Sequence, residues 1–129
     1  MPAVQNISIS TPVVLVVEGV RDSAAVHRSI ECTTIETRGM DVEGALPDIR
    51  AALIEGAVVV LTDSDPAGER IRNYIHAEVP GCIDARVEPK NGRQYARVES
   101  SSDAQILAAL RKAGVEVTYH LPILNPIAK

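Results

Sequence analysis

The sequence contains no phenylalanine and no tryptophan, and its only aromatic residues are Tyr74, Tyr95 and Tyr119. A core without large aromatic rings must be filled by valine, isoleucine, leucine and alanine. At 129 residues, the chain is long enough to bury such a core without disulfides or structural metal ions. We therefore expect a single domain over residues 1–129, with its core at 12–113 and a tail at 114–129.

Long apolar segments and metal-binding cysteine motifs are also missing. The longest apolar runs have about five residues, whereas roughly twenty are needed to span a bilayer. The opening residues have neither the basic region nor the apolar region of a secretory signal. Cys32 and Cys82 stand alone, in no metal-ligand spacing. We expect a cytoplasmic protein that makes no membrane contact and keeps both cysteines as thiols.

An excess of basic residues is absent too, because 13 lysines and arginines face 17 acidic residues and give a net charge of −4. The whole molecule does not attract polyanions, so any contact with nucleic acid must be local. One such locality is the segment 86–97, where Lys90 and Arg93 lie near Tyr95. An ordinary solvated loop is the alternative interpretation of this segment.

The hydrophobic pattern alternates between two periodicities along the chain. Short apolar or alternating runs predict strands, and apolar residues at helical spacing with capping signals predict helices. The predicted strands are 12–17, 32–37, 57–63 and 82–87, and the predicted helices are 23–31, 45–56, 68–79 and 101–114. Asp22 is expected to cap the first helix, and the tail is expected to add an edge strand. This alternation predicts an α/β fold with a largely parallel sheet of about four strands, flanked by helices.

Acidic side chains follow two of the predicted strands. Asp63 and Asp65 come directly after the third strand and, being two positions apart, project from one face. Glu18 follows the first strand, and if the two strands are neighbours the three carboxylates converge. Their mutual repulsion is relieved by a cation, and carboxylate oxygens are the ligands that Mg²⁺ prefers. Glu69 is a further candidate ligand, although an acid in the first turn of a helix also complements the helix dipole.

A hydrophobic strand that ends in aspartate occurs in several protein classes. ATPases of the P-loop type would need a G-x-x-x-x-G-K-[ST] segment, which this sequence lacks. Receiver domains would need an acidic pair near the start and a suitably placed lysine. Phosphatases with an aspartate nucleophile would need a hydroxyl or small apolar residue soon after the second aspartate, where 66–68 reads Pro-Ala-Gly.

The segments VVEGVRD (16–22) and VVVLTDSDPAGERIR (58–72) together resemble the two motifs of the Toprim domain, the catalytic module of topoisomerases, bacterial primases and small nucleases. Within that superfamily the sequence is most similar to the ribonuclease that matures 5S ribosomal RNA. The similarity covers roughly residues 12–113 and includes 97–110 as a third segment. It excludes the additional RNA-binding region of that ribonuclease.

The sequence departs from this pattern at two positions. Val20 stands where the motif has a lysine, with Arg21 beside it, and Arg97 stands where the third segment has a glycine. A basic group that would touch phosphate is therefore absent or displaced. Substrate recognition does not carry over, and 5S ribosomal RNA is one candidate substrate.

The resemblance implies roles for the matching residues. Glu18 would act as general acid or base at the scissile phosphate, and Asp63 and Asp65 would complete the catalytic group. The same three residues, with Glu69, would hold Mg²⁺, for which Mn²⁺ is expected to substitute. We further predict nucleic-acid contacts, with phosphate steering near the strand end and along the basic segment, at Arg21, Arg70, Arg72, Lys90 and Arg93.

The function we predict is an Mg²⁺-dependent endonuclease that acts on RNA, which we favour over DNA, and in particular on structured RNA. A second hypothesis is a primase-type or topoisomerase-type module that acts on DNA with a partner. A third is a binding module without turnover. In each case a protein partner that supplies substrate recognition stays open.

Overall fold

The computed structural model of the chain describes residues 6–9, 12–38 and 42–120. Strands and helices alternate along it, which confirms the predicted α/β class. The elements are β1 (Asn6–Ile9), β2 (Val13–Val17), α1 (Val20–Ser29), β3 (Thr33–Glu36), α2 (Val42–Glu55), β4 (Ala57–Thr62), α3 (Pro66–Glu78), β5 (Ile83–Arg86), the 3₁₀ turn η1 (Val98–Ser100), α4 (Asp103–Lys112) and β6 (Val117–His120). No helix among these residues is long and apolar enough to cross a membrane.

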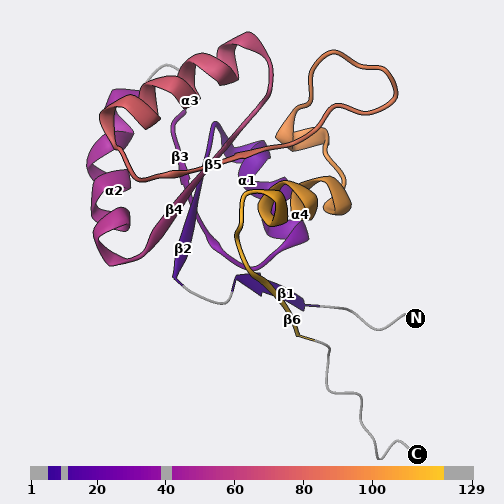
Figure 1. Cartoon of the computed structure of the whole chain (residues 1–129), viewed down its shortest axis with the longest axis horizontal. Helices are drawn as coiled ribbons and strands as arrows, with labels where there is room; N and C mark the ends of the chain where they lie inside the picture. Colours follow the sequence, from indigo (N-terminus) through magenta and orange to yellow (C-terminus); the bar gives the residue numbers. More distant parts are fainter. Residues whose placement is uncertain (1–5, 10–11, 39–41, 121–129) are drawn as a thin grey trace, which may run out of the picture.

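Four parallel strands form the central sheet, in the order β3-β2-β4-β5. Helices α2 and α3 cover one face and α1 and α4 cover the other, as Figure 1 shows. Alternate residues of β4 point to opposite faces, so that Val58 and Val60 pack under α2 and α3 while Val59 and Leu61 pack under α1 and α4. All four are fully buried, which is why this strand reads as a continuous apolar run.

The first helix begins earlier than its predicted cap. Helix α1 starts at Val20, and Asp22 is its third residue rather than the residue before it. Its carboxylate accepts a hydrogen bond from the backbone N–H of Gly19 at 3.1 Å, the acidic half of a capping box. The predicted start is a few residues late, because aspartate is itself a favoured N-cap residue and Asp22 was assigned to that position.

A second, two-stranded sheet lies at the start of β3. The tail was expected to add an edge strand, but β6 pairs with β1 in an antiparallel ribbon, separate from the parallel sheet. The N–H of Glu31, just before β3, donates to the carbonyl of Ile7 in β1 at 2.6 Å. The ribbon therefore sits at the amino ends of the parallel strands, and the remainder of the predicted tail, 121–129, lies outside the described residues.

The cysteines behave as expected, since neither forms a disulfide and both are partly buried. Burial raises the pKa of the Cys32 thiol to about 11. A thiol that stays protonated at neutral pH packs as a small apolar group.

The turn from β4 into α3 is built by three consecutive features of the DSDPAG segment. Asp65 is the N-cap of α3 and accepts from the N–H of Gly68 at 2.8 Å, and Pro66 occupies the first helical position. At Gly68 the helix lies directly against the preceding strand end. A Cβ added there would stand 2.0 Å from the carbonyl oxygen of Asp63, closer than any real contact. The glycine is therefore required for the helix to start this close to Asp63.

Replacing Gly68 by alanine tests this close approach. We expect Gly68→Ala to lower the free energy of unfolding by on the order of 2 to 3 kcal/mol, because the backbone must move to admit the methyl group. Gly19→Ala is the control, since a Cβ at Gly19 meets nothing within 4 Å. Gly19→Ala should lower the free energy of unfolding by less than about 1 kcal/mol. Urea denaturation of both variants measures the difference, and equal effects would contradict the steric explanation.

Candidate active site

The order of the sheet brings the predicted carboxylates together. Because β2 and β4 are neighbouring parallel strands, the residues that follow them meet at the same edge. The backbone N–H of Asp63 donates a hydrogen bond to Oε2 of Glu18 at 2.8 Å, across the gap between the two strand ends. Asp63 in turn accepts at Oδ1 from the N–H of Val98, also at 2.8 Å. The predicted meeting of Glu18 and Asp63 is thus present in the structure.

These carboxyl groups are crowded and only partly solvated. Burial raises the pKa of Glu18, and the nearby charges of Asp63, Asp22 and Asp65 raise it further, while the hydrogen bond from Asp63 lowers it. The pKa of Asp63 is raised by the same cause, burial, and by Asp65, and Arg97 partly offsets the effect. Proton affinity above the usual range is typical of groups that transfer protons or await a cation.

Two further acids belong to this group although sequence reasoning gave them no site role. Asp22 is buried, and desolvation together with the charge of Asp63 raises its pKa to about 6. Glu99 contributes to the same effect and lines the same shallow cavity as Glu18, Asp22 and Asp63. Both lie inside the segments that carry the family resemblance, which is the signal that could have identified them.

Asp65 and Glu69 are placed differently from Glu18 and Asp63. Asp65 uses one oxygen to cap α3, although its charge still acts on both Glu18 and Asp63. Glu69 accepts a hydrogen bond from Arg86, and its Oε2 lies 3.8 Å from Nε of Arg72. The structure therefore gives Glu69 cationic partners and does not place it among the charges that act on Glu18 or Asp63.

No ready-made metal cage is visible in the described part of the chain, since no three acidic, histidine or cysteine side chains there are grouped closely enough to hold an ion. The donor set nevertheless suits a lightly held divalent cation. Mg²⁺ commonly uses one or two carboxylates, with waters and substrate phosphate filling its other positions. Glu18 and Asp63 each commit an oxygen to a backbone amide and keep a second one. This arrangement fits an open site better than a closed one.

Arg72 has a different role from the predicted phosphate contact. Its side chain is fully buried, and its guanidinium donates to the backbone carbonyls of Val60, Thr62 and Ala85 at 3.3, 3.0 and 2.8 Å. It also donates to the carboxylate of Asp84. A group with this burial and these partners cannot reach a phosphate on a substrate. Arg72 instead fixes the carboxyl ends of β4 and β5.

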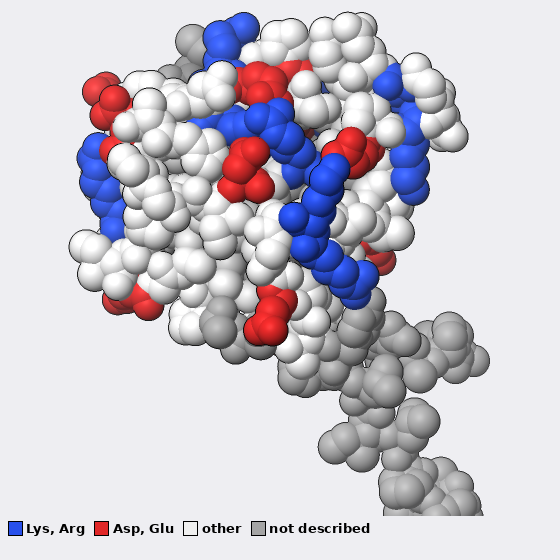
Figure 2. All heavy atoms as spheres, in the orientation of Figure 1, with Lys and Arg blue, Asp and Glu red and all other residues white. Residues whose placement is uncertain are grey.

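The other predicted nucleic-acid contacts lie at the surface. Arg21 is exposed on the rim of the carboxylate cavity, with its guanidinium 3.9 Å from Glu99. Arg70 is exposed on α3, next to the buried Arg72. Lys90 and Arg93 line a second cavity, whose walls come from the loop after β5, from η1 and from the start of α4. On the face drawn in Figure 2, acidic and basic side chains are interspersed, so no single sign of charge dominates it.

Comparisons with known proteins identify relatives of this chain by sequence and by fold. No family profile matches the sequence. The sequence is 32% identical to ribonuclease M5 of Bacillus anthracis over 109 residues, which are 81% of this chain and 59% of that protein. It is 40% identical to ribonuclease M5 of Listeria monocytogenes over 102 residues, 74% of this chain and 53% of that protein. The chain thus spans just over half the length of these curated relatives.

A solved structure shares the fold. The small TOPRIM domain protein from Bacillus stearothermophilus superposes with a TM-score of 0.68, and the match covers 84% of this chain and 90% of that one. The two sequences are 23% identical over this match. The predicted fold class and the sequence resemblance are both confirmed.

Asp22→Asn tests the crowding of the carboxylates through the pH dependence of stability. A carboxyl group whose pKa is raised on folding, here from 3.8 to about 6, stabilises the folded state below its unfolded pKa and loses that contribution as pH rises through the folded value. We expect wild type and Asp22→Asn to have similar free energies of unfolding near pH 4. At neutral pH the variant should be more stable by on the order of 1 kcal/mol, because asparagine places no buried charge beside Asp63, although it accepts a weaker hydrogen bond from Gly19. Urea denaturation across this pH range measures the difference, and a difference that does not grow with pH would contradict the interpretation.

Arg72→Met tests the buried guanidinium. The variant leaves three backbone carbonyls and the Asp84 carboxylate without their donor, so we expect a loss of about 3 kcal/mol in the free energy of unfolding. Arg70→Met, two positions away on the exposed face of the same helix, should change it by less than about 0.5 kcal/mol. Thermal or urea denaturation compares the two variants. A similar loss of unfolding free energy in both would contradict a stabilising role for the buried Arg72 guanidinium.

Proposed function

Since this chain has a Toprim fold and a sequence related to that of ribonuclease M5, we propose that it is a divalent-metal-dependent nuclease that cleaves phosphodiester bonds in structured RNA. The observation that supports the proposal most directly is the contact between the ends of β2 and β4, where Glu18 accepts a hydrogen bond from Asp63. This contact places two carboxylates with raised pKa values side by side at the sheet edge. A precursor of 5S ribosomal RNA is one substrate of this class.

Glu18 is the residue that we assign to proton transfer. Burial raises the pKa of Glu18 above its ordinary value, which makes it a better proton acceptor than a fully solvated glutamate. The hydrogen bond from Asp63 fixes one carboxylate oxygen and leaves the other for the reacting group. Glu18 thus acts as general acid or base at the scissile phosphate.

Asp63 is oriented by the chain itself and needs no ion to hold its position. The N–H of Val98 fixes one oxygen, and the charge of Arg97 limits the repulsion from Asp65. Asp63 and Glu18, with Asp65 as a further contributor, would hold Mg²⁺ or Mn²⁺. Such an ion would supply positive charge to the phosphoryl oxygens, where negative charge develops during cleavage.

In this proposal Glu69 is not a direct ligand of the divalent ion. Its carboxylate is bonded by Arg86 and lies near Arg72, so it would have to leave both partners to reach an ion. We therefore assign it to the ion-pair network that supports the start of α3.

A non-catalytic binding module is the alternative that one observation favours. Val20 occupies the position at which the motif has a lysine, so a basic group that would contact phosphate is absent there. No structural observation favours the other alternative, a primase-type or topoisomerase-type module that acts on DNA. A preference for RNA or for DNA as substrate distinguishes it from the proposed ribonuclease. Both alternatives are decided by the same assay.

The assay incubates the chain with end-labelled structured RNA, single-stranded RNA and plasmid DNA, in Mg²⁺ or in EDTA. We expect RNA cleavage that requires Mg²⁺, and a loss of at least about a hundredfold in rate for Glu18→Gln and Asp63→Asn, because each removes a charge that acts on the reacting phosphate. Glu55→Gln, an exposed acid at the end of α2, is the matched control and should cleave as wild type does.

Two results would count against the proposal. Cleavage that persists in EDTA or in Glu18→Gln would point to a contaminating nuclease. Absence of cleavage, combined with calorimetric Mg²⁺ binding that Asp63→Asn abolishes, would support the binding module instead.

A further inference from the structure

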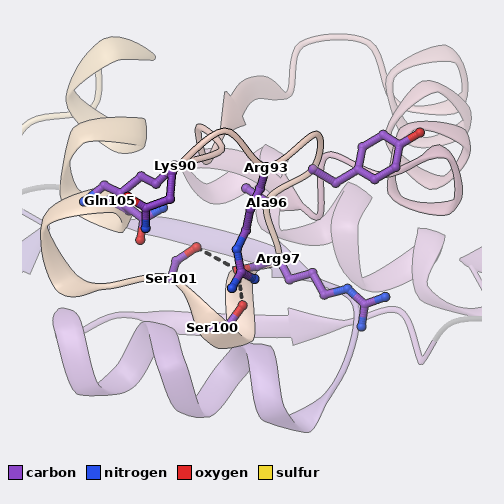
Figure 3. A pocket seen from close by; sticks show the side chains of 9 residues that line it. Lys90, Arg93, Ala96, Arg97, Ser100, Ser101 and Gln105 are labelled. Atoms are coloured by element: carbon purple, nitrogen blue, oxygen red, sulfur yellow. Dashed lines mark hydrogen bonds between the residues drawn. The ribbon is translucent and has the colours of Figure 1, made fainter.

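A second hollow lies beside the carboxylate group, on the other side of the loop that follows β5. The loop projects from the molecule in Figure 1 and leads back through η1 to the start of α4. Together they enclose a cavity of about 340 Å³. Its basic and polar walls come from Lys90, Arg93, Arg97, Ser100, Ser101 and Gln105, seen from close by in Figure 3.

The cavity is positively charged although the molecule is not. Three of its lining side chains are cationic and none is acidic. The three acids nearest to it in the sequence have other partners. Glu88 pairs with Lys112 at 3.2 Å, Glu99 pairs with Arg21 at 3.9 Å, and Asp103 accepts a hydrogen bond from the hydroxyl of Ser29 at 2.8 Å. Within the described ranges, the exposed side chains of Lys90 and Arg93 have no ion-pair partner. Unpaired cations in a hollow are free to neutralise an anion.

Figure 3 shows how these side chains are arranged. Lys90 lies beside Gln105 at one end, and Arg93 extends from the loop toward Ser100 and Ser101. The hydroxyl of Ser101 donates to the carbonyl of Arg97 at 2.7 Å and so holds the wall in place. Gln105 is also held, because its amide donates to the carbonyl of Glu88 at 3.1 Å. The two cations therefore project over a wall whose polar groups are already bonded.

Hydrogen bonds tie this loop to the catalytic strand. The N–H of Ser64, between the two aspartates, donates to the carbonyl of Ala96 at 2.9 Å, and the N–H of Ala96 donates to the hydroxyl of Ser64 at 2.7 Å. Two residues further on, the N–H of Val98 is bonded to Asp63. These hydrogen bonds, together with one from the Ser64 hydroxyl to the carbonyl of Ala96 at 3.3 Å, fix the cavity and the carboxylates relative to each other.

Arg97 connects the two charged regions. It lines the cavity, yet its charge acts on Asp63, and in Figure 3 its side chain extends in a different direction from that of Arg93. Positive charge therefore continues from Lys90 and Arg93 past Arg97 to the acidic edge. A polyanion that approaches an edge carrying several carboxylates needs such a local path.

We propose that this cavity binds a backbone phosphate of the RNA strand that is cleaved, other than the scissile one, with Lys90 and Arg93 as its ligands. The inference rests on the proposed function, because it assigns a further phosphate of the same substrate. Tyr95 lines the cavity and is 43% exposed, so its ring is available for a base of the same strand. The site positions RNA without reading its sequence.

The test measures RNA binding separately from cleavage. A fluorescein-labelled RNA hairpin with single-stranded arms is titrated with protein in EDTA, so that no chemistry occurs, and the titration is repeated at several salt concentrations. The variant is Lys90→Gln/Arg93→Gln. The control is Arg28→Gln/Arg50→Gln, which removes the same charge from exposed positions of α1 and α2.

We expect the cavity variant to bind the hairpin about fivefold or more weakly than wild type, with a slope of log affinity against log salt that is smaller by about 1. The control should bind within about twofold of wild type. Since Lys90 and Arg93 are exposed, both variants should unfold at the wild-type temperature. Inorganic phosphate is added in a separate arm to find out whether the site takes a free anion equally well.

Equal binding by the cavity variant and the control would overturn the inference, as would failure of wild type to bind the hairpin. Displacement of the hairpin by low concentrations of inorganic phosphate would also overturn it, because the site would then serve a free anion. If wild type binds the hairpin through Lys90 and Arg93 but does not cleave it in Mg²⁺, the phosphate site is supported and the proposed nuclease activity is contradicted. If wild type cleaves RNA but Lys90→Gln/Arg93→Gln binds the hairpin as well as wild type does, the proposed phosphate site is contradicted and the proposed nuclease is not.

Discussion

A buried guanidinium holds the edge of the sheet on which the candidate site is built. Arg72 comes from α3, and its donors reach the last carbonyls of β4 and a carbonyl of β5. Parallel strands end in carbonyl groups that need partners, and the burial of this edge keeps water away from several of them. The bonds to Val60 and Thr62 secure the backbone immediately before Asp63. The carboxylates on one side of the edge and the Asp84–Arg86–Glu69 ion pairs on the other both depend on this arrangement.

The acidic edge keeps its shape at a cost in stability. Glu18, Asp22 and Asp63 are all partly desolvated and repel one another, as their raised pKa values show. Each of the three accepts a backbone N–H, from Asp63, Gly19 and Val98 respectively. These amides lower the energy of the charged forms without neutralising them. Such strain is typical of sites whose geometry is preserved for a ligand rather than for folding.

The fold was predictable because its signals are local, whereas much of the site depends on contacts between distant segments. The apolar run of β4 and the capping box of Ser102 and Gln105 predict their elements directly. The burial of Arg72 could not be predicted, since an arginine on a helix is normally solvated and only the folded sheet shows the carbonyls that it meets. The short strand β1 was not predicted, because it has four residues and its strand partner, β6, lies at the far end of the chain. Asp22 and Glu99 were not predicted as site residues. Taken alone, Asp22 is explained equally well as a helix cap, and Glu99 as an acidic residue of a loop.

The pairing of β1 with β6 also restricts the order in which the protein can fold. Asn6 is opposite His120 in this ribbon, so the pair joins nearly the whole described length of the chain. Within the parallel sheet, β2 pairs with β4 across the intervening β3 and α2, and no strand of that sheet forms a hairpin with the next. Contacts of this kind form slowly, because a long loop must close before any of them is gained. During synthesis on the ribosome, the sheet and its acidic edge can form first, and the ribbon can close only after residue 120 has emerged.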